Sequence, residues 1–220
     1  THTHTHTHTH THSVNGRISE RGLKNVECWA LSKTLDIKEE HLIIDPMCGA
    51  GSTLFEAARF WPNAKYVGLD VDPRQIERAR TNARQLGASV PNVQLQPADV
   101  SMLRGIPMKD GECNGLMCDL PFGKQYGSRA DNLDLYPRAL AEFARVMSPS
   151  PSAKMVFLTD SLNLPLLQAA VTSINDGHDS DEAKNKKWSV TAIRSFELSP
   201  NTTGNIVLVQ RAPIQGGEGG

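Results

Sequence analysis

The sequence lacks the features of a membrane or secreted protein. No apolar run approaches the roughly 18 to 20 residues needed to cross a bilayer, and no signal peptide is visible. There are only 4 cysteines, none of them in a C-x-x-C pair, and a chain of 220 residues does not need disulfide bonds to fold. We therefore expect a soluble protein with free thiols, located in the cytoplasm or the nucleus.

Excess charge is also lacking. The chain has 23 Lys and Arg against 24 Asp and Glu, a net charge of −1. A protein that holds a polyanion by itself usually carries a basic surface. Any contact with nucleic acid must therefore be local or come from elsewhere.

Histidine is scarce once the first twelve residues are set aside. These alternate Thr and His, as a metal-affinity tag would, and we treat residues 1–15 as a tag and linker. His41 and His178 remain, too far apart in sequence to suggest a metal site.

We expect one domain over 16–212 and a glycine-rich, disordered tail over 213–220.

Apolar runs and helical patterns alternate along that domain. This order is typical of a doubly wound, mostly parallel α/β sheet. The segment 175–187 is polar and reads as a solvated loop, although Lys184, Lys186 and Lys187 could touch phosphate. Strands are expected at 42–44, 65–70, 92–96, 115–118 and 154–159, helices at 23–35, 52–60, 73–86, 133–147 and near 162–173, and two final strands at 188–198 and 205–211, joined by a turn over 199–204.

A glycine loop follows the first expected strand. Backbone amides around Gly49 and Gly51 can approach a nucleotide at the carboxyl edge of such a sheet. A dinucleotide fingerprint would need glycine where Leu54 stands, and Asp45 would repel a pyrophosphate. The pattern instead resembles the D-x-x-x-G-x-G loop of enzymes that use S-adenosylmethionine.

That resemblance assigns roles to acids at the strand ends. Asp45 would hold the loop and the methionine ammonium, and Asp70 the two ribose hydroxyls, with Asp72 as the alternative. Asp99 follows the third strand, where related enzymes bind the adenine amino group. The expected cofactor site also includes Met47, Cys48, Val71 and Val100, with Cys48 as a small residue fitting the turn and not a nucleophile.

The tetrapeptide at 119–122 resembles the [D/N]-P-P-[Y/F] motif of amino methyltransferases, with Leu120 in place of the first proline. The Asp119 carboxylate and the Leu120 carbonyl can accept the two hydrogens of a planar amine and direct its lone pair at a methyl group. Asp119 could then take up the proton. Pro121 completes the motif, and Phe122 offers a ring on which a base can stack.

Cys118 raises a rival chemistry, attack on a pyrimidine ring by a thiolate. It ends an apolar strand beside a carboxylate, which raises a thiol pKa and disfavours this chemistry.

The longer strings CDLPFGKQYGS at 118–128 and NLDLYP at 132–137 resemble the catalytic domain of THUMP-domain tRNA guanine-N2 methyltransferases over about residues 16–212. This implies the class-I methyltransferase fold, Rossmann-like, with seven strands, a C-terminal antiparallel hairpin and helices on both faces. It also implies N2-methylguanosine formation in tRNA and a small zinc-binding activator subunit. Lys124 and Arg129 become candidates to meet RNA phosphate. The family's N-terminal THUMP module, which binds RNA, is not found in this sequence, so we expect an excised catalytic domain.

Other functions stay open. The Asp119 motif serves any planar nitrogen, so adenine N6, a guanine of snRNA or a protein glutamine are alternative acceptors. A catalytically idle cofactor-binding scaffold is a different class, against which Asp45, Asp70, Asp99 and Asp119 argue. A nicotinamide oxidoreductase is disfavoured by Leu54.

Overall fold

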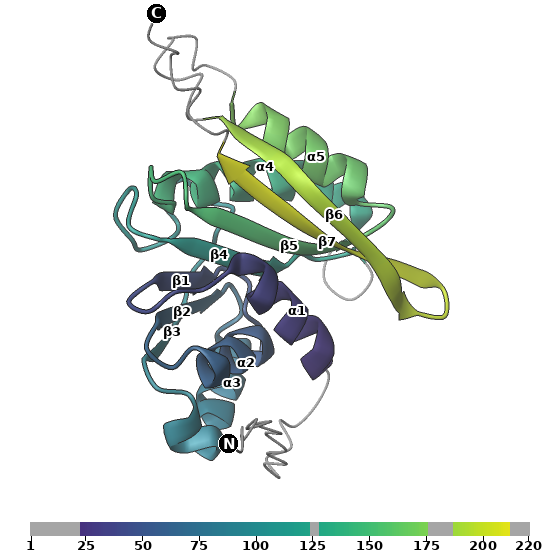
Figure 1. The fold of residues 1–220 in the computed structure, drawn as a ribbon. Coiled ribbons are helices and arrows are strands. Elements are labelled where there is room, and N and C mark those ends of the chain that lie inside the picture. Colours follow the sequence, from purple (N-terminus) through teal and green to yellow (C-terminus); the bar gives the residue numbers. More distant parts are fainter. Residues whose placement is uncertain (1–22, 124–127, 176–186, 212–220) are drawn as a thin grey trace, which may run out of the picture.

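The computed structural model describes residues 23–123, 128–175 and 187–211, and it forms a single sheet with helices on both faces (Figure 1). The seven strands follow the order β3-β2-β1-β4-β5-β7-β6. The strands are β1 (Leu42–Asp45), β2 (Lys65–Asp70), β3 (Val93–Pro97), β4 (Gly115–Asp119), β5 (Lys154–Asp160), β6 (Trp188–Ser199) and β7 (Thr202–Arg211). The helices are α1 (Asn25–Leu35), α2 (Ser52–Phe60), α3 (Pro73–Leu86), α4 (Arg129–Val146) and α5 (Leu164–Ser173), with a short 3-10 turn η1 (Gly87–Ser89).

The carboxyl ends of the parallel strands lie at one edge of the sheet. Strands β1 to β5 are parallel, whereas β7 runs antiparallel to β5 and β6 antiparallel to β7. The ends of the parallel strands therefore meet at one edge of the sheet, and the β6–β7 turn reaches the same edge because Gly204 pairs with Asp160. This is the expected class-I methyltransferase fold.

Two apolar layers hold the helices against the sheet. Leu31 of α1, Phe55 of α2 and Ile76 of α3 share one buried cluster, which defines the α1 face of the sheet. Tyr136 and Phe143 of α4 and Leu167 of α5 share the cluster on the opposite face. Because β4 is buried on both faces, its residues 116–118 form the continuous apolar run typical of a central parallel strand.

Two expected boundaries were wrong. Helix α4 begins at Arg129, not 133, because the Ser128 side chain accepts the Asp131 N–H while the Asp131 side chain accepts the Ser128 N–H. The expected turn over 199–204 was too long, because Thr202 pairs with Ser199 and Thr203 with Glu197. Only Pro200 and Asn201 separate the two strands.

Several expectations fall outside the described residues. These are the tag at 1–15, the tail at 213–220, the loop residues 176–186 with Lys184 and Lys186, and Lys124. Within the described ranges, no helix combines the length and apolar character needed to cross a membrane.

Candidate functional site

The glycine loop is fixed to the end of β2. The Cys48 N–H donates to the Leu69 carbonyl at 2.7 Å, and the Gly49 N–H donates to Asp70 Oδ2 at 2.9 Å. Asp70 Oδ1 accepts the Asp72 N–H at 2.9 Å. Asp70 therefore holds the loop itself, a role that the sequence analysis did not give it.

The two loop glycines differ in what surrounds them. Both have positive φ, +52° at Gly49 and +87° at Gly51. A Cβ on Gly51 would lie 2.4 Å from the Phe55 ring, whereas a Cβ on Gly49 would meet nothing within 4 Å in the part of the chain that the structure describes. Gly51 is thus needed for internal packing, and Gly49 borders open space that a ligand can enter.

A buried amide on helix α3 supports the same loop. Asn82 is 3% exposed, and its Nδ2 donates to the Ala50 carbonyl at 3.0 Å. Asn82 was not among the predicted site residues. Its signal was a polar residue in the buried stripe of an amphipathic helix that also contains Ile76 and Ala79.

Cys48 packs inside the loop. Its Sγ lies 3.0 Å from the position of a Cβ on Gly68, so the absence of a side chain at Gly68 makes room for the thiol. Burial, with Asp45 and Asp70 nearby, raises the pKa of Cys48 well above its usual value. Burial and the same acidic surroundings raise the pKa of Cys118 as well, so neither thiol is poised as a nucleophile.

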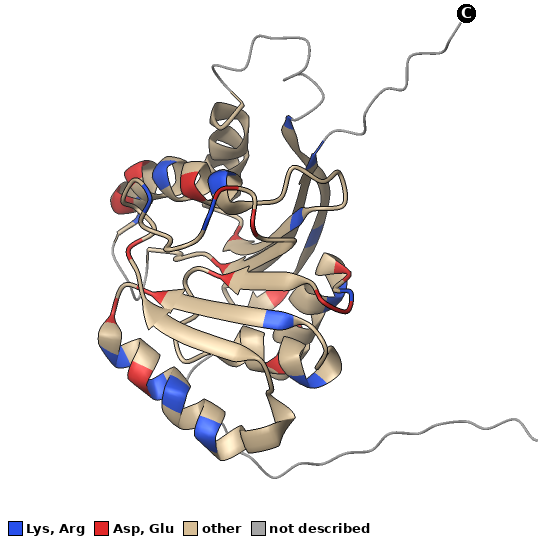
Figure 2. Cartoon of the chain, turned by 90° about the vertical axis from the view of Figure 1, so that its left-hand side faces the viewer, with Lys and Arg blue, Asp and Glu red and all other residues tan. Residues whose placement is uncertain are grey.

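Three carboxylates share the carboxyl edge, and Figure 2 shows acidic segments at the ends of neighbouring strands. Asp45 is 2% exposed, and its Oδ1 accepts the Met47 N–H at 3.2 Å. Burial, and then the charges of Asp119 and Asp70, raise the pKa of Asp45 well above its usual value. Desolvated carboxylates held together in this way favour a cationic ligand.

Asp119 has a carboxylate oxygen that the fold leaves unsatisfied. Its Oδ1 is buried and has no hydrogen-bond partner among the described residues. Burial raises the pKa of Asp119 to about 7. A buried polar atom without a partner is costly, so this oxygen is suited to accept a hydrogen bond from a ligand.

The residues after Asp119 are held in place by α4 and by the loop before α5. The Pro121 carbonyl accepts Asn132 Nδ2 at 2.8 Å and the Tyr136 hydroxyl at 2.9 Å. The Phe122 carbonyl accepts Asn163 Nδ2 at 3.2 Å. We call Asn132, Tyr136 and Asn163 the carbonyl clamp.

The carbonyl clamp was also missed. Asn163 is oriented by Asp160, whose Oδ1 accepts its N–H at 2.9 Å and its Nδ2 at 2.7 Å. Asn132 and Tyr136 are four residues apart and therefore share one side of α4, which was the available signal.

Other motif residues serve the turn itself. Leu120 is 1% exposed and its N–H donates to the Leu158 carbonyl at 3.0 Å. A Cβ on Gly123 would lie 2.5 Å from the Arg129 backbone N, and φ there is +74°, so only glycine fits. Phe122 is partly buried and packs against the cluster on the α1 face.

The remaining predicted residues lie around this edge with different contacts. Asp72 caps helix α3 by accepting the Arg74 N–H, which leaves Asp70 as the stronger candidate of that pair. Asp99 is exposed, and its Oδ1 accepts the Ser101 N–H and hydroxyl. The Arg129 guanidinium donates to the Leu162 carbonyl at 2.7 Å, so it already serves a structural contact. Met47 is partly buried, Val71 is 68% exposed and Val100 is 6% exposed.

Curated relatives share part of this chain. It is 33% identical over 130 residues to the U6 snRNA (guanine-N(2))-methyltransferase THUMPD2 of Bos taurus, covering 59% of this chain and 24% of that protein. It is 29% identical over 147 residues to the human tRNA (guanine(6)-N(2))-methyltransferase THUMP3, covering 63% of this chain and 29% of that protein. The chain thus spans 24% and 29% of the length of these two relatives.

Among solved structures, TrmN from Thermus thermophilus has the same fold, with a TM-score of 0.69 at 20% identity over 88% of this chain and 51% of that one. Residues 22–174 match the family UPF0020, described as an RMKL-like methyltransferase domain. This match spans more than half of the chain and includes the glycine loop, the three clustered carboxylates and the carbonyl clamp. The chain belongs to the UPF0020 family of RMKL-like methyltransferase domains.

Proposed function

We propose that this chain transfers a methyl group from S-adenosylmethionine to the N2 amine of a guanine in RNA. The observation that carries the proposal is the buried Oδ1 of Asp119, which has no hydrogen-bond partner among the described residues and lies at the same sheet edge as the glycine loop. The family match supports methyl transfer, and both relatives described above are named as guanine-N2 methyltransferases.

The residues present fit the cofactor. S-adenosylmethionine carries a methyl group on a sulfonium and so supplies the electrophile. Asp45 would attract the methionine ammonium, and the open space at Gly49 would admit the ligand next to the loop. The loop residues Met47, Cys48 and Gly51 would border the same end.

The adenosine end is proposed to lie along β2 and β3. Asp70 would accept the ribose hydroxyls with the lone pairs that remain after it binds Gly49 and Asp72. Asp99 would accept the adenine amino group. Val71 and Val100, which directly follow these acids, would flank the ring.

The acceptor amine is proposed to bind between Asp119 and the Leu120 carbonyl. An exocyclic amine has its lone pair delocalised into the ring, so two acceptors that bind its hydrogens can orient the nitrogen toward the methyl group. Asp119 would take up the proton lost by the product, a task that suits a carboxyl group with a pKa of about 7. Phe122 would support the plane of the base, and the carbonyl clamp would keep Pro121 and Phe122 in register with Asp119.

The RNA substrate is proposed to be tRNA. The relative named for U6 snRNA is the specific reason to retain snRNA as a second candidate. Because the chain has a net charge of −1, we propose that RNA recognition depends on a separate RNA-binding module, and the family resemblance adds a small zinc-binding activator. We place this activity in the cytoplasm or the nucleus, where free thiols persist.

Nucleoside mass spectrometry tests the proposal. Total RNA is incubated with the chain and S-adenosylmethionine, digested, and compared with the same reaction using Asp119→Asn. Because the RNA-binding module and the activator are not in the reaction, we expect a small increase in N2-methylguanosine with the native chain and none with Asp119→Asn. Methylation confined to adenine or to protein would exclude guanine N2 as the acceptor, and cofactor binding without any transfer would favour the idle scaffold.

A further inference from the structure

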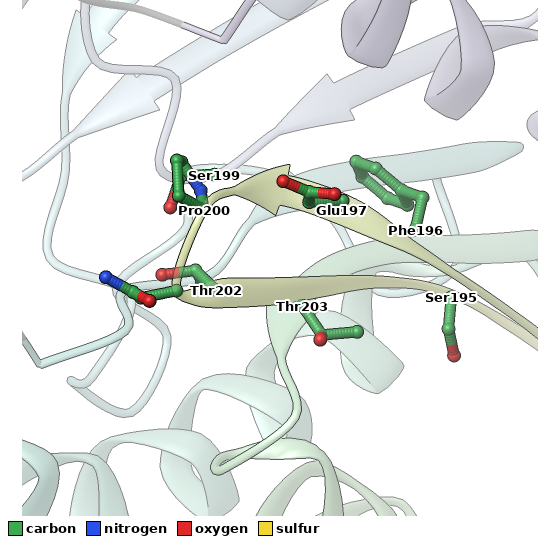
Figure 3. Close-up of a pocket in the computed structure, with 8 residues that line it drawn as sticks. Ser195, Phe196, Glu197, Ser199, Pro200, Thr202 and Thr203 are labelled. Atoms are coloured by element: carbon green, nitrogen blue, oxygen red, sulfur yellow. The ribbon is translucent and has the colours of Figure 1, made fainter.

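The β6–β7 hairpin carries a pocket at the same sheet edge as Asp119. The pocket has a volume of about 510 Å³ and is lined by residues of the hairpin tip, including Phe196, Glu197, Asn201 and Thr203. Figure 3 shows the Phe196 ring on β6, close to the tip of the hairpin. Nothing described above assigns a role to this pocket.

Strand register places the hairpin on the same face as Asp119. Asp119 pairs with Leu158 of β5, Leu158 with Ile206 of β7, and Ile206 with Arg194 of β6. Paired residues of neighbouring strands point to the same face of a sheet. Leu158 and Ile206 belong to the buried cluster on the α1 face, so Asp119 and Arg194 also point to that face.

Phe196 follows Arg194 by two residues and therefore shares its face. It pairs with Gly204, where a Cβ would lie 3.0 Å from the Phe196 ring, and it is partly buried against the same cluster. Arg194 is exposed. Asp119 and Arg194 are three strands apart, and at about 4.8 Å per inter-strand spacing this is a distance of about 14 Å across the sheet.

If a guanine is bound at Asp119, the next nucleotide of the RNA can therefore lie over the hairpin.

The chemistry of the pocket distinguishes a base from a phosphate. Glu197 pairs with Thr203 and so lies on the opposite face from Phe196, and its carboxylate would repel a phosphate placed at the hairpin tip. The Phe196 ring offers a stacking surface. Arg194, outside this pocket, supplies the cation that a backbone phosphate requires.

We propose that the α1 face of the β6–β7 hairpin binds the nucleotide next to the target guanosine, with its base stacked on Phe196 and its phosphate paired with Arg194. This inference rests on the proposed RNA acceptor. It assigns to the hairpin the choice of sequence around the modified base.

Binding of short RNAs tests the proposal without requiring catalysis. Fluorescence anisotropy is measured for the 220-residue chain, saturated with S-adenosylhomocysteine, and a labelled single-stranded pentamer with a central guanosine. Two further pentamers carry an abasic residue on the 5′ or the 3′ side of the guanosine. We expect one abasic RNA to bind about tenfold more weakly than the intact one, as loss of base–aromatic stacking predicts.

Variants identify the residues. Phe196→Leu keeps an apolar side chain against Gly204 and should bind intact and abasic RNA equally weakly, whereas Phe196→Trp should restore the discrimination. Thermal unfolding verifies that each variant is folded. Arg194→Gln should lower the salt dependence of binding by about one phosphate contact. Arg138→Gln, on α4 at the other face and paired with Asp134, should not change it.

The proposal is overturned if the native chain binds no pentamer, if it binds all three alike, or if Phe196→Leu still discriminates. Methyl transfer is measured separately. If the chain discriminates between intact and abasic RNA but forms no N2-methylguanosine, the proposed function is refuted and the hairpin site is retained. If it forms N2-methylguanosine but does not discriminate, the hairpin site is refuted and the proposed function is retained.

Discussion

Asp70 accepts the backbone N–H of Gly49 at 2.9 Å, so the carboxylate proposed to bind the ribose also shapes the loop proposed to bind the methionine end. These two tasks meet on one side chain because β1 and β2 are adjacent and parallel, with Asp45 paired to Gly68. A change at Asp70 should therefore affect folding and cofactor binding together.

Asp70→Ala should lower the free energy of unfolding by about 1 to 3 kcal/mol, because the Gly49 and Asp72 amides lose their acceptor. It should also weaken S-adenosylhomocysteine binding by at least about tenfold, the equivalent of one lost hydrogen-bonded contact to the ribose. Urea denaturation and calorimetric titration measure the two effects. Asp72→Ala is the matched control: it removes the α3 cap at about 1 kcal/mol and should leave the affinity unchanged. An equal loss of affinity in both variants would contradict the assignment.

Gly49 and Gly87 form a second matched pair. Their φ angles are +52° and +54°, and a Cβ on either would meet nothing within 4 Å among the described residues. Alanine at Gly49 should cost about 1 kcal/mol of stability through backbone strain, and alanine at Gly87 should cost more, because its ψ of −129° lies outside the left-handed helical region. Only Gly49→Ala should also reduce cofactor affinity, because only that Cβ would enter the proposed ligand space. Thermal shift with and without S-adenosylhomocysteine separates the two effects, and an unaltered ligand-induced shift in Gly49→Ala would argue against the site.

The pKa of Asp119 predicts a pH dependence of stability for the ligand-free chain. Burial raises it from 3.8 to about 7, so between these values the folded state holds a proton that the unfolded state has released. Stability should therefore fall as the pH rises from about 4 to about 7 and level off above that. Asp119→Asn should flatten the part of this slope due to Asp119. Denaturation midpoints at half-unit pH steps provide the measurement, and identical slopes in the two proteins would show that Asp119 is not protonated in this range.

The carbonyl clamp should matter for turnover more than for cofactor binding. Tyr136→Phe removes the hydroxyl bond to Pro121 at about 1 kcal/mol of stability, and it should lower kcat by roughly tenfold or more because the acceptor motif shifts. Tyr66→Phe is the control, since its hydroxyl donates to the Trp61 carbonyl at 2.8 Å near the start of β2, at the opposite end of that strand from Asp70. Its stability loss should be similar and its kcat unchanged. A fall in kcat of the same size in both variants would show that the carbonyl clamp stabilises the fold without a specific role in turnover.

The sequence predicted where three strand-end acids lie but not the residues that support them. Asp45, Asp70 and Asp119 were found because the carboxyl ends of parallel strands meet at one edge, a property that depends only on strand order and direction. The supports depend on how α3, α4 and the loop before α5 are turned toward the sheet. Asn82 and Asn163 donate to carbonyls 32 and 41 residues away, contacts that no local pattern specifies.

The same contrast holds for the fold. Apolar periodicity located the strands and helices, since burial sets their spacing. The first turn of α4 depends instead on the side chains of Ser128 and Asp131, and the length of the hairpin depends on pairing between its two strands. The nucleotide proposed beside Phe196 could not be predicted from local sequence either, because its location follows from the register of three strand pairs.

The position of β7 has a consequence for how the protein is made. Although it is the last of the described strands in sequence, β7 lies between β5 and β6, and in the described sheet β6 pairs with β7 alone. During translation the edge of β5 that pairs with β7 therefore stays unpaired until residues 202–211 have left the ribosome. Strands β1 to β5 can pair earlier. The side of the sheet formed by β5, β7 and β6 is therefore completed last, and the unpaired edge of β5 is exposed to wrong strand pairing in the nascent chain.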